Sequence, residues 1–101
     1  MAVSTASIPT DSASRLIKRL CKHWSHKFEI ETDEDASYGR IDFGHSMCSL
    51  DARDGRLEVM LESNDAELER MQGVVADHLQ RMAAKEETLE IDWQDAAPQP
   101  R

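Results

Sequence analysis

The chain has 101 residues, of which 40% are hydrophobic and 32% charged, proportions typical of a globular protein rather than a disordered one. A chain of this length has room for a single hydrophobic core. Its 20 acidic and 12 basic side chains give a formal charge of -8, which disfavours binding to nucleic acid or to an anionic membrane surface.

The cellular compartment is indicated by what the sequence lacks. No apolar run is long enough to span a bilayer, and residues 1–9 have neither the cationic start nor the apolar core of a signal peptide. The two cysteines, Cys21 and Cys48, fall at apolar positions of the pattern, so no disulfide framework is expected. We therefore expect a cytoplasmic protein without a membrane partner.

The two ends of the chain lack hydrophobic periodicity. Residues 1–9 are small and polar, and residues 95–101 contain Pro98 and Pro100 among Ala and Gln. We expect a flexible N-terminal segment over 1–9, a single domain over 10–94 and a disordered tail over 95–101.

The expected domain starts with a helix, for which Thr10, Asp11 and Ser12 are all suitable N-caps. Its apolar residues trace one helical face: Ala13, Leu16, Ile17, Leu20, Cys21 and Trp24. The period then changes to two, which predicts strands over 27–31, 40–43, 47–52 and 56–62. The Gly44-His45 and Asp54-Gly55 pairs predict the turns between the last three of these strands.

A second helix is predicted from Asn64, with Glu67 at capping-box spacing, and a last strand contains Leu89, Ile91 and Trp93. The order is α-β-β-β-β-α-β, which predicts an α+β fold. The simplest packing is a two-layer sandwich with both helices on one face of a mainly antiparallel sheet. The other face is expected to be bare and acidic.

The positive charge is concentrated in the first helix. Residues 11–28 carry five basic side chains against Asp11 alone, while most carboxylates fall on the predicted solvent face of the sheet. This helix either binds a small anionic ligand or an acidic protein partner, or is simply a solvated face.

The candidate binding residues lie at the end of that helix. Lys22 and His26 are four residues apart and His23 and His26 three, a spacing that allows all three to converge on one ligand, and Arg19 lies one turn earlier. His23 and His26, with Cys48 or His78, could also ligate a metal, but the spacing is not that of a zinc motif. Ordinary histidines at the edge of the core are the alternative, and no metal or cofactor is expected.

No catalytic residue is predicted. The chain has no phosphate-binding glycine loop, no nucleophile elbow and no dinucleotide fingerprint. Cys21 and Cys48 are interpreted as core residues rather than nucleophiles, and Trp24 and Trp93 as core rather than stacking platforms. A small enzyme remains a third hypothesis, although no acid–base pair supports it.

The segment Cys21-Lys22-His23-Trp24-Ser25-His26-Lys27 is distinctive. Together with residues 10–15, 39–44, 48–50, 78–81 and Trp93, it resembles a bacterial family known only as domain of unknown function 2218. The chain departs from the family near Met82-Ala83-Ala84, where aromatic residues are more usual.

The resemblance implies no activity. Some members look like appendages of siderophore-interacting flavin reductases, or resemble proteins encoded near iron-uptake functions. It singles out Lys22, His23 and His26 for testing. The leading hypothesis is a non-catalytic binding or accessory domain that uses its basic first helix; the alternative is an iron-linked module that binds metal, haem or a siderophore-type ligand. Oligomeric state stays open.

Overall fold

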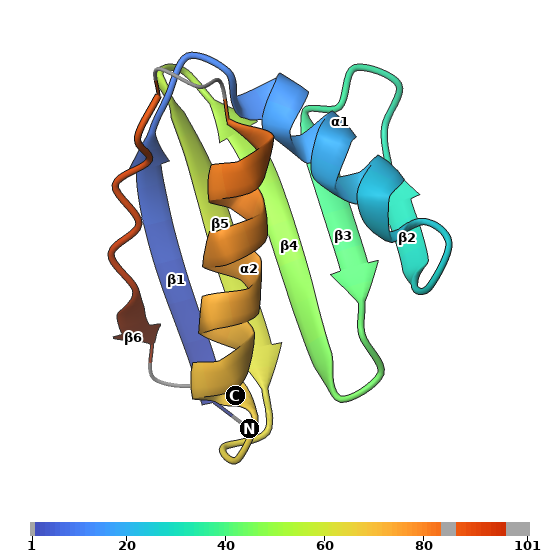
Figure 1. The fold of residues 1–101 in the computed structure, drawn as a ribbon, viewed down its shortest axis with the longest axis vertical. Coiled ribbons are helices and arrows are strands. Elements are labelled where there is room, and N and C mark those ends of the chain that lie inside the picture. The colour runs from blue at the N-terminus through green and yellow to red at the C-terminus, as the bar shows by residue number, and fades with distance from the viewer. Residues whose placement is uncertain (1, 84–86, 97–101) are drawn as a thin grey trace, which may run out of the picture.

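The computed structural model describes residues 2–83 and 87–96 and contains two helices and six strands. In chain order these are β1 (Ala2–Pro9), α1 (Ala13–Trp24), β2 (Glu29–Thr32), β3 (Tyr38–Asp42), β4 (Ser46–Arg53), β5 (Arg56–Ser63), α2 (Leu68–Met82) and β6 (Gln94–Ala96). The strands form one antiparallel sheet in the order β2-β3-β4-β5-β1-β6 (Figure 1). The predicted α+β class is confirmed.

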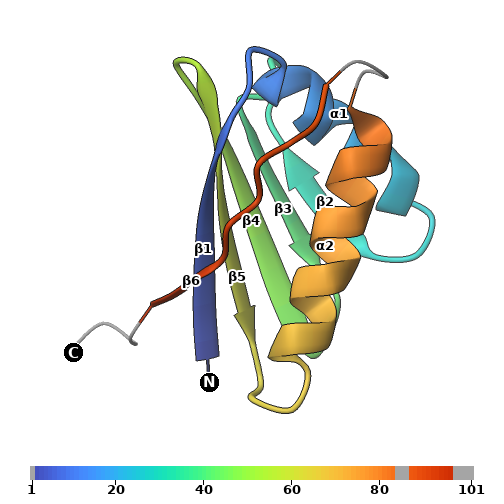
Figure 2. The same cartoon turned by 60° about the vertical axis from the view of Figure 1, so that its left-hand side comes forward.

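The two helices lie on the same side of the sheet (Figures 1 and 2). α1 contacts β2, β3, β4 and β5, whereas α2 packs on β5 and β1 and touches α1. No segment of residues 2–83 or 87–96 covers the opposite face. Glu29, Glu31 and Asp42, which point to that face, are exposed. Neither described helix is long and apolar enough to cross a membrane.

The core forms where α1 meets the sheet. All six apolar residues predicted for this helix are buried, and Leu16, Ile17 and Leu20 are almost completely inaccessible. Gly39 of β3 allows the close approach of α1, because a Cβ at this position would lie 2.8 Å from Ile17 Cγ2 and 2.9 Å from Cys21 Sγ. α1 therefore packs directly on the backbone of β3.

The N-terminal segment is a strand, and the prediction of a flexible segment over 1–9 is wrong for the described residues. β1 lies between β5 and β6, with Ile8 opposite Leu57. Ser4, Ala6 and Ile8 face the core and are buried. Gln72 Nε2 of α2 donates a hydrogen bond of 2.6 Å to Ser4 Oγ. The observed order is β-α-β-β-β-β-α-β, because this strand is held by tertiary contacts that its small side chains do not reveal in the sequence.

The C-terminal part also differs from the prediction. The segment around Leu89 is extended without a strand partner, and strand β6 starts later, at Gln94. The side chain of Gln80 holds this segment instead: Oε1 accepts from Leu89 N (2.8 Å) and Nε2 donates to Glu87 O (2.9 Å). Residues 95 and 96, expected in a disordered tail, pair with β1; residues 97–101 of that expected tail lie outside the described residues.

Candidate functional site: a hollow lined by four histidines

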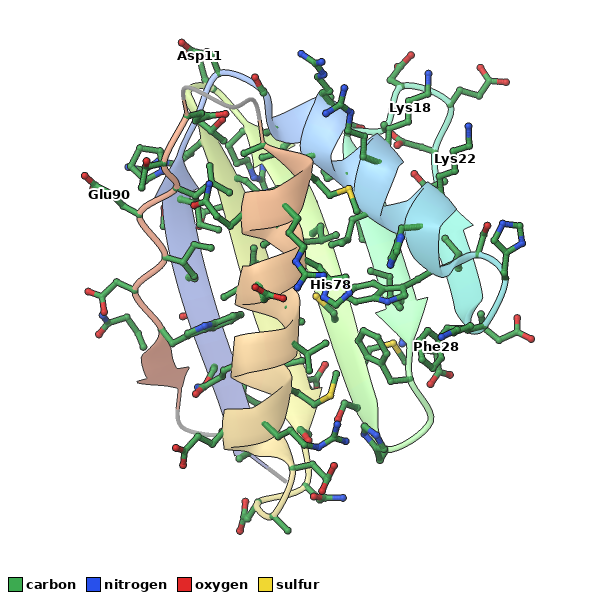
Figure 3. All side chains as sticks on the ribbon, viewed as in Figure 1. Asp11, Lys18, Lys22, Phe28, His78 and Glu90 are labelled. Carbon is green, nitrogen blue, oxygen red and sulfur yellow. The ribbon has the colours of Figure 1, made fainter. Side chains whose placement is uncertain are left out.

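All four histidines of the chain line one hollow of about 390 Å³, which we call the histidine hollow. It lies between the C-terminal end of α1, the α2 helix and the turn from β3 to β4. Two of its lining residues, Phe28 and His78, are labelled in Figure 3. The lining consists of His23, Trp24, His26, Lys27, Phe28, Phe43, His45, Arg70, Met71, Val74 and His78. Segments far apart in the sequence therefore build the site together.

Three aromatic rings form its apolar wall. Trp24 is only 5% exposed, and its ring meets Phe43 edge to face, with centroids 5.0 Å apart. Phe28 meets Phe43 in the same way at 4.8 Å. Trp24 is buried because it completes the apolar face of α1, and its aromatic neighbours fix the orientation of its ring.

His78 occupies the side of the hollow formed by α2. Its Nδ1 lies 2.7 Å from Val74 O, one turn earlier in the helix. A carbonyl oxygen can only accept, so Nδ1 carries the proton and Nε2 remains for another partner. The ring lies 4.8 Å from that of Trp24 and 5.2 Å from that of His23, measured between centroids. The imidazoles of α1 and α2 are therefore in contact across the helix pair.

His45 joins the hollow to the interior of the sheet. Its Nδ1 is 2.7 Å from Ser46 Oγ, which is 2.7 Å from Ser63 Oγ, and both hydroxyls are buried. Arg70 donates to His45 Nε2 at 3.4 Å and is bound by the Glu67 carboxylate. The hydrogen bond from Arg70 lowers the pKa of Glu67. These contacts hold the ring of His45 in one orientation.

The charge of the hollow is opposite to that of the protein. Lys27 and Arg70 line it, and none of its lining residues is a carboxylate, although the chain carries -8. Glu67 neutralises part of the charge of Arg70 from outside the lining. Charge and polarity together favour an anionic ligand with an apolar part.

Only two of the four binding residues predicted from the sequence line the histidine hollow. His23 and His26 line the hollow. Lys22 lines a different hollow, beside Asp33 and Glu34. Arg19 donates to Met82 O at 2.9 Å and ties α1 to the end of α2. The expected convergence of Lys22 with both histidines does not occur, because consecutive residues of a helix point in different directions and Lys22 points away from the hollow that His23 lines.

Sequence reasoning did not place Phe43, His45 or Arg70 in the site, and considered His78 only as a possible metal ligand. The usable signal was the family motif at the end of α1, which marked one side of the hollow. Nothing in the periodicity of α2 or of the β3–β4 turn shows which side chains meet that motif in space.

Metal and thiol chemistry have no visible basis in the described part of the chain. Within residues 2–83 and 87–96, no three His, Cys, Asp or Glu side chains are grouped so that they could hold a metal ion. Cys21 and Cys48 are free and buried. Burial raises the pKa of both thiols, that of Cys48 to about 12 with a contribution from Cys21, which opposes formation of a thiolate nucleophile.

Fold and site together define a small α+β domain with one bare sheet face and a ligand-sized hollow between its helices. The chain belongs to the family described as uncharacterized protein conserved in bacteria, domain of unknown function 2218, whose model matches residues 5–94. The resemblance found in the sequence is thus confirmed. A similar protein is PA4090 from Pseudomonas aeruginosa, known from an NMR structure, with 52% identity and a TM-score of 0.76 over 93% of this chain and 96% of that chain. No curated protein matches the sequence.

Proposed function

We propose that the protein is a non-catalytic binding domain whose histidine hollow takes a small anionic ligand. The observation that supports this most is the lining itself: two permanently charged cations, four imidazoles and no carboxylate, in a chain of charge -8. An arrangement of cations without a carboxylate attracts anions.

The size of the hollow favours a small molecule over a protein surface. Its volume of about 390 Å³ lies at the lower end of the range of roughly 300–1,000 Å³ typical of ligand pockets. A carboxylate side chain of an acidic protein partner offers the same chemistry, but an exposed basic face would suit such a partner better than a recess. The exposed cations of α1, Lys18 and Lys22, lie outside this recess.

The iron-linked alternative rests on the family resemblance, and no observation of the described residues favours it. It predicts that ferric citrate perturbs the imidazoles of His23 and His26 while citrate alone does not. This comparison is therefore included in the experiment.

The experiment follows histidine ring signals by NMR during titration with acetate, inorganic phosphate, benzoate, citrate and ferric citrate. We expect at least one anion to shift the signals of His23 and His78, and Lys27→Met to weaken that binding about threefold or more, the effect of losing one charge contact. The matched control is Lys22→Met, which removes the same charge from the same segment but outside the hollow and should leave the affinity unchanged.

Two results would overturn the proposal. The first is an absence of shifts with every anion at millimolar concentration. The second is an anion affinity of Lys27→Met equal to that of the wild type, when circular dichroism shows that the variant is folded. If ferric citrate were the only ligand to shift the histidine signals, the result would support the iron-linked alternative instead.

A further inference from the structure

We infer that the anion taken by the histidine hollow is a planar aromatic carboxylate, bound beside His23 and His78 with uptake of a proton. This inference rests on the proposed function and adds to it the class of ligand and the group that recognises it. The geometry of the two rings and of the aromatic wall carries it.

The aromatic wall favours a flat ligand. Trp24 and Phe43 stand at 85° to each other, and Phe28 and Phe43 at 73°, so the three rings form a rigid array of edges and faces. A flat ligand ring can meet an aromatic wall in offset or edge-on contact, whereas a puckered ring of the same size makes poorer contact with it. Met71 and Val74 of α2 add apolar surface to the lining of the hollow.

The two adjacent imidazoles supply the recognition of the carboxylate. His23 and His78 are 5.2 Å apart between ring centroids, and the interplanar angle is 49°. Nδ1 of His78 is committed to Val74 O, so only Nε2 can contact a ligand. In the neutral imidazole, Nε2 can only accept a hydrogen bond. It can donate one to a carboxylate only after the ring has taken up a proton.

Binding is therefore coupled to protonation. Lys27, Arg70, His26 and His45 also line the hollow, and the Glu67 carboxylate faces Arg70. A carboxylate bound beside an imidazole favours the imidazolium form of that ring. Ligand binding and proton uptake then strengthen each other, as linkage requires.

The test compares 2-naphthoate with its saturated counterpart, decahydro-2-naphthoate, by isothermal titration calorimetry at pH 5.5, 6.5 and 7.5. We expect the planar acid to bind about tenfold more tightly, and its affinity to increase by up to about tenfold per pH unit as the pH falls, the limit for one linked proton. At pH 6.5 the binding heat should differ between two buffers of different ionisation enthalpy, neither of which is an anion that competes for the site.

The variants identify the protonated group. His78→Gln and His23→Gln retain a polar side chain that cannot gain charge, so each should reduce the dependence on pH and the buffer effect. Lys22→Met, outside the hollow, should retain both. Folding of each variant is checked by two-dimensional NMR.

The inference fails if the saturated acid binds as tightly as the planar one, or if affinity does not change with pH. The proposed function survives that failure as long as both acids still bind less well to Lys27→Met. If neither acid binds and simple anions also leave the histidine signals unchanged, the proposed function itself fails.

Discussion

The ring of Trp24 meets the ring of Phe43 edge to face, with centroids 5.0 Å apart and planes at 85°. Trp24 is the last residue of α1, and Phe43 directly follows β3. This one contact therefore joins the end of the helix to the end of the strand beneath it. The same two rings form part of the wall of the histidine hollow, so stability and the shape of the site depend on them together.

Trp24→Ala should destabilise the protein by about 3–5 kcal/mol, as is typical for truncation of a buried aromatic side chain. Trp24→Phe retains part of the wall and should cost clearly less. Urea unfolding measures both. A Trp24→Ala protein with a midpoint near that of the wild type would show that the ring does not anchor the helix.

The two described glycines outside turns should respond in opposite directions to alanine. Gly39→Ala places a Cβ against Ile17 and Cys21 and should cost about 1–3 kcal/mol through overpacking. Gly73 lies within α2 with no atom near its missing Cβ, so Gly73→Ala should stabilise by about 0.5–1 kcal/mol. Thermal unfolding of both variants measures the difference, and equal effects would contradict the close packing of α1 on β3.

Ile8→Ala should destabilise by about 2–5 kcal/mol, because this side chain of β1 is fully buried in the core. Val3 of the same strand points to the other face and serves as the control: Val3→Ala should cost much less. Chemical denaturation compares the two. An Ile8→Ala variant as stable as the wild type would restore the expectation of a flexible N-terminal segment.

Stability should decrease at alkaline pH through Cys48. Burial raises the pKa of this thiol from its ordinary value of 9.0 to about 12, so the folded protein retains a proton that the unfolded chain loses. The associated stability is complete below pH 9 and is lost as the pH rises from 9 towards 12. Between pH 7 and 10 we expect a loss of about 1–2 kcal/mol by urea unfolding.

The control for that loss is Cys48→Ala, which has no thiol at this position. The variant should begin from a lower stability at pH 7 but lose less between pH 7 and 10. An identical loss in both proteins would show that groups other than Cys48 cause the alkaline effect.

Arg19 should behave as a structural residue. Arg19→Met removes the hydrogen bond to Met82 O and should cost about 0.5–1.5 kcal/mol, the usual value for such a bond. Binding of any anion found for the hollow should not change, because this side chain does not line it. Weaker anion binding by a folded Arg19→Met variant would show that Arg19 contributes to the binding site.

Periodicity predicted the elements whose apolar side chains are large. All six expected core residues of α1 are buried, and the apolar faces of β4 and β5 alternate as predicted. β1 was missed because its buried positions include Ser4 and Ala6, whose small side chains produce no hydrophobic signal. Such a strand is specified by pairing with β5 and by the Gln72 side chain, which are tertiary contacts.

The candidate site was predicted only in part, because tertiary contacts also decide which side chains meet there. His23 and His26 stand out in a continuous motif, whereas Phe43, His45 and His78 reach the hollow from a turn and from a second helix. A helical spacing predicts neighbours on one helix only, and it grouped Lys22 with the two histidines although Lys22 lines a different hollow. Which side chains meet between elements is decided by the packing of the whole domain.

The position of β1 in the sheet affects how the protein is made. Ser4 pairs with Leu61 and Ala6 with Val59, so this strand leaves the ribosome well before its partner β5 and has no partner until β5 has followed. Until then its backbone donors and acceptors are open to other chains, which is the hazard of an unpaired strand. Its serines and threonine are polar, so the strand has little hydrophobic periodicity. For the same reason it is a poor nucleus for aggregation before β5 has been made.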